Sequence, residues 1–250
     1  MTVVVCTPTR NRGWTQSFSE ACMRTQSLQP DHWIVLDNSD IPEKGWKTSA
    51  ALTVTRIEGT QTVARMRNHI LDMAMALGAD FIVFWDDDDY YPPQRIRTGV
   101  EGLQSNPKAE IAAASMMYML LTQENCLMSV GPYDDNHGTA ATYTIRRAYA
   151  ATHRFDATKT FGEEYSFTRG WRAKMLQLPA EDTIVVMGHK GNTVSKSDVF
   201  WNPTKYLAKV VNNINGKQAW RSKWRLSQEL WDLWKTTFSV VESHSLQGFV

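Results

Sequence analysis

Short apolar runs alternate with segments of helical periodicity over the first 90 residues, and this alternation constrains the fold more than any other feature. The runs Thr2–Thr7, Trp33–Asp37 and Phe81–Trp85 each predict a strand, the first of them buried, and Ala51–Ile57 predicts a short strand. A helix is predicted from about Thr15 to Ser27. A second helix is predicted by apolar residues at spacings of three and four that end at a glycine, namely Val63, Met66, Ile70, Met73, Leu77 and then Gly78. Alternating strands and helices favour an α/β domain with a mostly parallel sheet.

Polar clusters follow three of these strands, at Pro8–Arg12, Asp37 and Asp86–Asp89. Because the carboxyl ends of parallel strands meet at one edge of a sheet, where α/β proteins bind their ligands, we expect one pocket there. Because side chains alternate along a strand, we expect Asp86 and Asp88 to point one way and Asp87 and Asp89 to point the other.

Two carboxylates on one side offer oxygen ligands to a divalent cation such as Mg²⁺ or Mn²⁺. Mg²⁺ is usually held by one or two carboxylates plus substrate phosphates, so the aspartate run indicates a phosphorylated substrate. The alternative is a solvated acidic turn before a helix that begins near Pro93.

Beyond Asn106 the pattern indicates a mixed sheet. The strand-like runs are Ile111–Leu121, Cys126–Val130, Ala140–Ile145 and Thr183–Met187, and a helix is predicted from about Glu163 to Leu176. We expect this half to contribute a second subsite.

The last segment is basic and rich in tryptophan. From Lys196 onward it has eight Lys or Arg against four Asp or Glu, in a chain whose net charge is +1. Aromatic residues at helical spacings predict a stripe on one helix, formed by Trp220, Trp224, Trp231, Trp234 and Phe238. We expect the stripe to pack on the core, the alternative being a docking surface. The predicted organisation is a domain at 1–195, with the expected pocket in its first half (1–105) and the second subsite in its second half (106–195), followed by a helical extension at 196–250 packed on the core.

Composition indicates a soluble globular protein, with 42% hydrophobic and 21% charged residues. Three cysteines without a CxxC spacing suggest neither a disulfide framework nor a zinc site. No basic leader opens the sequence and no run reaches the roughly 18 apolar residues of a membrane span, so we expect a cytoplasmic protein.

Several segments, in their order, resemble the GT-A glycosyltransferases of the family 2 type over about residues 2–195. Val3–Arg12 resembles that family's first strand and PTxNR turn, and Ile34–Ser39 resembles its second strand ending in Asp. The remaining matches are Ala64–Asn68 with the RN-bearing helix start, Phe84–Pro93 with the DxDD-x-x-x-P signature, and Phe161–Tyr165 with the acidic ED position. The resemblance implies a GT-A fold and metal-dependent transfer of a sugar, most often from a UDP-sugar, to an acceptor hydroxyl with inversion.

The resemblance also implies roles for residues on the donor side. Asp88 is the first metal ligand, Asp86 contacts the ribose or completes the metal shell, and Asp37 accepts a hydrogen bond from the base. The other residues that border the nucleotide or its phosphates are Thr7, Pro8, Thr9, Arg10, Arg12, Arg65, Arg67 and Asp87. For Arg65 and Arg67 a solvated helix start is an equal alternative.

On the acceptor side, Glu164 aligns with the general base that must accept the hydroxyl proton. Glu163 stays open as the base, because Glu-Glu replaces the family's ED here. His189 is a candidate metal ligand against a structural histidine, and Lys190 is a candidate phosphate contact with Asn192 a weaker one. His137 lies in an acceptor-side loop at 134–139.

Two other readings compete with glycosyl transfer. A nucleotidyltransferase also needs paired carboxylates, but the segment after the first strand is not glycine-rich. A binding module without turnover would hold a nucleotide or a glycan on the fold, or would bind nucleic acid through the basic, Trp-rich segment. The sequence leaves three candidate acceptors, a glycan, a small molecule and a modified DNA. It does not define the oligomeric state.

Overall fold

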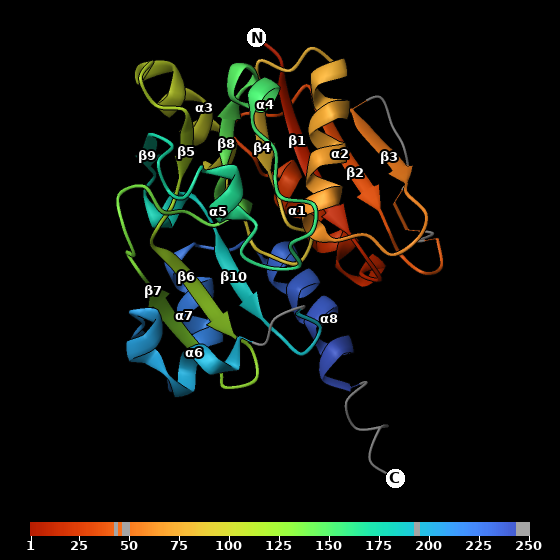
Figure 1. Ribbon diagram of the computed structural model, residues 1–250. Helices are drawn as coiled ribbons and strands as arrows, with labels where there is room; N and C mark the ends of the chain where they lie inside the picture. The colour runs from red at the N-terminus through yellow and green to blue at the C-terminus, as the bar shows by residue number, and fades with distance from the viewer. Residues whose placement is uncertain (43–44, 47–50, 193–195, 244–250) are drawn as a thin grey trace.

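The computed structural model describes residues 1–42, 45–46, 51–192 and 196–243, with the backbone alone for 239–243. A seven-stranded sheet has the order β3-β2-β1-β4-β8-β5-β9, and a four-stranded sheet has the order β10-β6-β7-β11 (Figure 1). In the larger sheet β8 alone runs antiparallel to its neighbours. The mostly parallel central sheet flanked by helices is therefore confirmed.

The first half follows the predicted alternation. Its elements are β1 (Val3–Thr9), α1 (Gln16–Arg24), β2 (His32–Asp37), β3 (Leu52–Arg56), α2 (Val63–Ala76), β4 (Phe81–Phe84) and α3 (Arg95–Ser105). A short 3₁₀ turn, Gly13–Thr15, precedes α1. Each predicted strand and helix of this half is confirmed in type and order. β1, β2 and β4 are almost wholly buried, whereas β3 buries only Leu52.

Successive side chains of β1 face opposite sides of the sheet. Val3 and Val5 join the core cluster that includes residues of α1 and α3, whereas Val4 and Cys6 join the cluster that includes residues of α2. The sheet is thus covered on both faces. The parallel neighbours β1 and β4 end at the same edge, and the strand order reverses between them, because β2 lies beside β1 whereas β5 lies beyond β4. In α/β sheets the ligand-binding crevice lies at such a reversal.

The second half departs from the sequence-based expectations. Its strands are β5 (Ile111–Ala113), β6 (Met117–Leu121), β7 (Cys126–Val130), β8 (Thr144–Arg146), β9 (Met175–Gln177) and β10 (Val185–Gly188), and its helices are α4 (Arg147–Thr152) and α5 (Glu164–Phe167). Two further 3₁₀ turns lie at Ala140–Thr142 and Ala180–Asp182. The single run predicted at 111–121 forms two strands that belong to different sheets, and the strand predicted at 140–145 is a 3₁₀ turn followed by β8.

The helix predicted from about Glu163 to Leu176 is wrong after its first turn. α5 ends at Phe167, and three successive residues, Arg169, Gly170 and Trp171, adopt positive φ angles of 58°, 71° and 62°. Residues 175–177 then form β9, which pairs in parallel with β5. Pairing along the sheet edge overrides the helical pattern of the sequence here.

The C-terminal segment comprises α6 (Ser197–Trp201), a 3₁₀ turn (Pro203–Tyr206), β11 (Lys209–Asn212), α7 (Gly216–Lys223) and α8 (Gln228–Ser243). The aromatic stripe is divided between α7 and α8, since the chain turns at Arg225, whose φ is 50°. The single helix predicted for the stripe is therefore wrong. Trp220, Trp234 and Phe238 are buried in the core. In Figure 1 α8 extends below the larger sheet, beside α1, which it contacts.

Candidate donor and acceptor site

A turn, and not a continued strand, carries the four aspartates. β4 ends at Phe84, and the turn that holds the aspartates is fixed by the Asp86 backbone N–H, which donates to the Tyr91 hydroxyl at 2.6 Å. The strict alternation predicted for the aspartates is wrong, because Asp87 and Asp88 both contact Arg12. The Asp89 carboxylate instead accepts a hydrogen bond from the Met187 backbone N–H at 2.8 Å, in β10.

Arg12 joins the loop after β1 to this turn. Its Nη1 atom lies 3.0 Å from Asp87 Oδ1 and 2.8 Å from Asp88 Oδ2. Thr9, the last residue of β1, donates its hydroxyl to Asp87 Oδ2 at 2.5 Å. Two of the three predicted polar clusters therefore meet at the crevice between β1 and β4.

His189 brings the second half of the chain to the same carboxylate. Its Nε2 atom lies 3.2 Å from Asp88 Oδ2, and both residues are buried. The Asn192 amide donates to that oxygen at 3.2 Å, and Arg12 Nη2 donates to the Gly191 carbonyl at 3.3 Å. Three nitrogen-bearing side chains from two distant segments, Arg12 on one and His189 with Asn192 on the other, thus converge on Asp88.

The electrostatics of the turn separate its aspartates. Burial opposes ionisation of Asp88, but the charges of Arg12, His189 and Lys196 outweigh it and hold the pKa of Asp88 below its usual value. Burial raises the pKa of Asp87 to about 7, although Arg12 lowers it. Burial and the neighbouring carboxylates raise the pKa of Asp89 well above the ordinary range. Asp88 is the carboxylate held in its ionised form.

A second arginine, Arg67, organises a separate cluster from inside α2. Thr62 caps this helix by accepting a hydrogen bond from the Arg65 backbone N–H. Arg67 Nη2 lies 3.1 Å from Asp86 Oδ1, and Arg67 Nη1 is hydrogen-bonded to the Glu163 carboxylate. Burial raises the pKa of Glu163, against the opposing charge of Arg67. The structure therefore groups Asp86 with Glu163 and not with Asp88.

Glu164 lies beside this cluster at the start of α5. It is half-buried, and its Oε1 atom accepts a hydrogen bond from the Ala140 backbone N–H at 3.2 Å. His137 is near enough for the charge of Glu164 to act on it, yet burial dominates and lowers the pKa of His137. The His137 ring packs 4.4 Å from the ring of Trp171 and 4.8 Å from that of Tyr133, between ring centroids.

Of the other predicted residues, Lys190 borders the Asp88 cluster, whereas Thr7, Pro8, Arg10, Asp37 and Arg65 have other partners or surroundings. Thr7 is buried and accepts a hydrogen bond from the Trp33 indole, and Pro8 is buried in β1. Arg10 pairs with Asp40 at 3.0 Å, and Arg56 pairs with Asp37 at 3.5 Å. Arg65 and Lys190 are exposed, and Lys190 lines a small cavity of about 100 Å³ with His189, Asn192 and Lys196.

Sequence reasoning missed two neighbours of this site. Lys196 contributes to the low pKa of Asp88, and the indole of Trp14 lies edge-on to His189 with ring centroids 5.2 Å apart. Trp14 follows the PTxNR-like turn by two residues, and this closeness in sequence could have indicated that it lies near the site. Nothing local marks Lys196, because its position depends on where β10 lies.

The residues around Asp88 fit a divalent cation completed by a substrate. Within the described ranges, no group of three or more His, Cys, Asp or Glu side chains is arranged to hold a metal ion. One carboxylate and one imidazole, Asp88 and His189, face each other in buried positions. Mg²⁺ and Mn²⁺ sites that are finished by substrate phosphates need only one or two protein ligands.

Comparisons with known proteins bear on the fold. No protein-family model matches the chain, and no curated protein matches its sequence. Solved structures do match in three dimensions. Among the residues that the structure describes, no helix is long and apolar enough to cross a bilayer.

The crystal structure of S. aureus TarS 1–349 matches with a TM-score of 0.57 and 14% identity, covering 75% of this chain and 61% of that one. The same fragment in complex with UDP-GlcNAc matches with a TM-score of 0.52 and 15% identity, over 77% of this chain and 60% of that one. The chain thus spans about 61% of the length of the TarS fragment.

A mannosyltransferase from Pyrobaculum calidifontis, PcManGT in complex with GDP-Man and Mn²⁺, matches over 99% of this chain and 76% of that one. The TM-score is 0.54 and the identity 12%. At such identities the likeness concerns architecture alone. The chain has the GT-A fold of these proteins, with its polar cluster at the carboxyl ends of β1 and β4.

Proposed function

We propose that the protein is a metal-dependent glycosyltransferase that moves a sugar from a UDP-sugar to an acceptor hydroxyl with inversion. The observation that carries the proposal is the convergence of Arg12, His189 and Asn192 on the buried Asp88 carboxylate at the crevice of a GT-A fold. Structural neighbours in complex with UDP-GlcNAc and with GDP-Man and Mn²⁺ support this assignment.

On the donor side, Asp88 and His189 would hold Mn²⁺ or Mg²⁺, with Asp86 near the ribose. Such an ion supplies positive charge to the diphosphate as the glycosidic bond breaks. Arg12 and Lys190 orient the phosphates, because both lie next to the Asp88 cluster. Thr9, Arg10 and Asp37, at the ends of β1 and β2, border the nucleoside.

On the acceptor side, Glu164 is the proposed general base. Glu163 is buried and its carboxylate is hydrogen-bonded to Arg67, so we assign it the role of a structural partner. Glu164 is half-buried and has one backbone hydrogen bond, so its second oxygen is the better placed of the two to accept a proton. In a single displacement the acceptor oxygen forms a bond to the anomeric carbon, the nucleoside diphosphate leaves, and Glu164 takes the hydroxyl proton.

Calorimetric titration tests the donor side. UDP, GDP and their sugars are titrated into the protein with Mn²⁺ and then with a chelator. We expect one diphosphate to bind in the presence of Mn²⁺ and to lose at least tenfold in affinity when the metal is chelated.

The Asp88→Asn variant should lose that metal-dependent affinity, while Asp72→Asn, in an exposed ion pair on α2, should not. Failure of every nucleotide to bind under either condition would overturn the proposal. Unchanged binding by the Asp88 variant would remove this residue from the metal site and leave the donor site elsewhere.

A further inference from the structure

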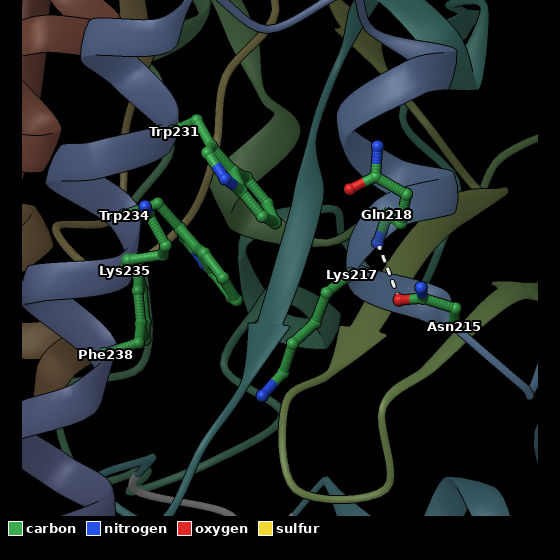
Figure 2. Close-up of a pocket in the computed structure, with 7 residues that line it drawn as sticks. All are labelled: Asn215, Lys217, Gln218, Trp231, Trp234, Lys235 and Phe238. Atoms are coloured by element: carbon green, nitrogen blue, oxygen red, sulfur yellow. Dashed lines mark hydrogen bonds between the residues drawn. The ribbon is translucent and has the colours of Figure 1, made fainter.

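A cavity outside the Asp88 cluster lies between the two C-terminal helices. Its volume is about 270 Å³. The residues that line it are Asn215, Lys217, Gln218, Trp231, Trp234, Lys235 and Phe238. Figure 2 shows the two indoles projecting from α8 and Lys217 projecting from α7 into the same space. The cavity is large enough to take a planar ring and is walled by aromatic side chains.

Cationic groups accompany these rings. Trp231 and Trp234 are stacked, with centroids 5.0 Å apart and planes at 17°. The Arg221 guanidinium lies 5.1 Å from the ring centroid of Trp231, and Lys217 Nζ lies 5.8 Å from that of Trp234. Aromatic faces paired with nearby cations are the combination that binds bases and phosphates together.

Cations outnumber carboxylates around the cavity. On α8, Asp232 pairs with the lining residue Lys235 at 2.6 Å. Between Gly216 and Gln228 the chain carries Lys217, Arg221, Lys223 and Arg225 and no acidic residue. None of the seven lining residues is a carboxylate. A neutral glycan presents hydroxyl groups that need acceptors as well as donors, whereas a phosphodiester chain needs cations. The surface therefore complements a polyanion that carries rings.

We propose that the cavity between α7 and α8 binds a base of a single-stranded nucleic acid, with the flanking phosphates held by Lys217 and Arg221. The half-buried Trp231 supplies the stacking surface, backed by the buried Trp234. Neither the stacking nor the phosphate contacts depend on the proposed glycosyl transfer.

The position of the cavity relates it to the candidate active site. Phe238 lines the cavity, and its ring centroid is 5.3 Å from that of His189, which lies 3.2 Å from Asp88. A strand bound between α7 and α8 would thus pass next to the donor site. If the protein transfers a sugar as proposed above, this adjacency identifies the acceptor as a nucleic acid that carries a hydroxyl.

Fluorescence anisotropy with a short labelled oligothymidylate and the full chain tests the binding. We expect the affinity to fall steeply as NaCl concentration rises, because phosphate contacts release counterions. An unlabelled abasic strand of the same charge should compete at least tenfold less well than the oligothymidylate, since it offers nothing to stack. Equal competition by the abasic strand, or no binding at low salt, would overturn the proposal.

Variants locate the site. Lys217→Gln with Arg221→Gln should lower the affinity about tenfold and reduce the slope of log affinity against log salt by about 1.4, which is 0.7 for each lost contact. Lys205→Gln with Lys209→Gln is the matched control, because both are exposed lysines of the same segment outside the cavity. Equal losses in the two pairs would overturn the assignment to this cavity.

Trp231→Leu should lower the affinity about tenfold through lost stacking. The lysine and arginine variants keep the proposal testable if this substitution unfolds the protein. Since the titrations contain no nucleotide sugar, a failure here leaves the donor-binding calorimetry unaffected, and failure of the calorimetry leaves these titrations unaffected.

Discussion

Arg12 and Arg67 each bridge two carboxylates, but their surroundings differ. The Arg12 side chain is 18% exposed and comes from a loop, and it contacts Asp87 and Asp88. The Arg67 side chain is 5% exposed, comes from within α2, and contacts Asp86 and Glu163. An ion cluster at an open edge has room for a ligand, whereas a closed one holds neighbouring groups in place. We therefore propose that Arg12 contributes to ligand binding and that Arg67 holds Asp86 and Glu163 in position.

The two adjacent glutamates provide the largest expected effect. Glu164→Gln should lower the transfer rate about 10²- to 10⁴-fold while nucleotide binding stays intact, because the amide cannot accept the hydroxyl proton. Turnover with a donor and acceptor pair, and calorimetry with the donor, measure the two quantities. Glu163→Gln is the control and should keep a much larger share of the rate. The reverse ranking would make Glu163 the base.

Replacing Arg67, the more buried of the two arginines, should lower the stability of the fold. Arg67→Met leaves two carboxylates without their cation, one of them buried, and should lower the free energy of unfolding by about 3–5 kcal/mol. Urea unfolding measures it. Arg12→Met should cost less, because water reaches this partly exposed cluster. Adding Glu163→Gln to Arg67→Met should recover part of the loss, since the pair is in direct contact. A loss below about 1 kcal/mol for Arg67→Met would contradict the assigned role.

A smaller effect on stability is expected at Thr9, which contacts the carboxylates bound by Arg12. Thr9→Val keeps the shape of the side chain but removes the hydroxyl that donates to Asp87, so unfolding should become easier by about 1–3 kcal/mol. Thr53→Val, on an exposed position of β3, serves as the matched change and should have little effect. Equal values for the two variants would show that the Thr9 hydroxyl contributes nothing.

The smallest effect concerns pH on the acceptor side. Burial lowers the pKa of His137, so folding favours the neutral ring. Stability from this group is complete above the ordinary histidine pKa of about 6.5 and is lost as pH falls through the lower folded value. The difference in unfolding free energy between the wild type and His137→Gln, measured at a series of pH values, should shrink or reverse on acidification. A difference that grows as pH falls would contradict this.

The periodic first half was predictable because its strands and helices bury the faces that their sequence patterns indicate. Pro8–Arg12 and Asp86–Asp89 were placed at one edge for the same reason. The helix predicted at 163–176 failed because Arg169 and Trp171 adopt left-handed conformations that their residue types do not announce. The division of the aromatic stripe at Arg225 has the same origin.

The partners within the candidate site were harder to predict than its members. Asp86 and Asp88 were expected to act as a pair, yet each is bound to a different arginine. The contact between His189 and Asp88 joins residues 101 positions apart, and that between Arg67 and Glu163 joins residues 96 positions apart. Local patterns identify candidate residues, but the packing of two sheets decides which of them meet.

The backbone of Tyr90 is bonded to Val185 in both directions, at 3.1 and 2.9 Å, directly after the aspartate turn. Together with the contact from Met187 to Asp89, this bridge ties the turn to a strand nearly a hundred residues away. A fragment that stops before Thr183 would carry every aspartate of the turn and lose the strand that holds them. Grafting the donor site onto another scaffold therefore requires β10 to be transplanted with the first half.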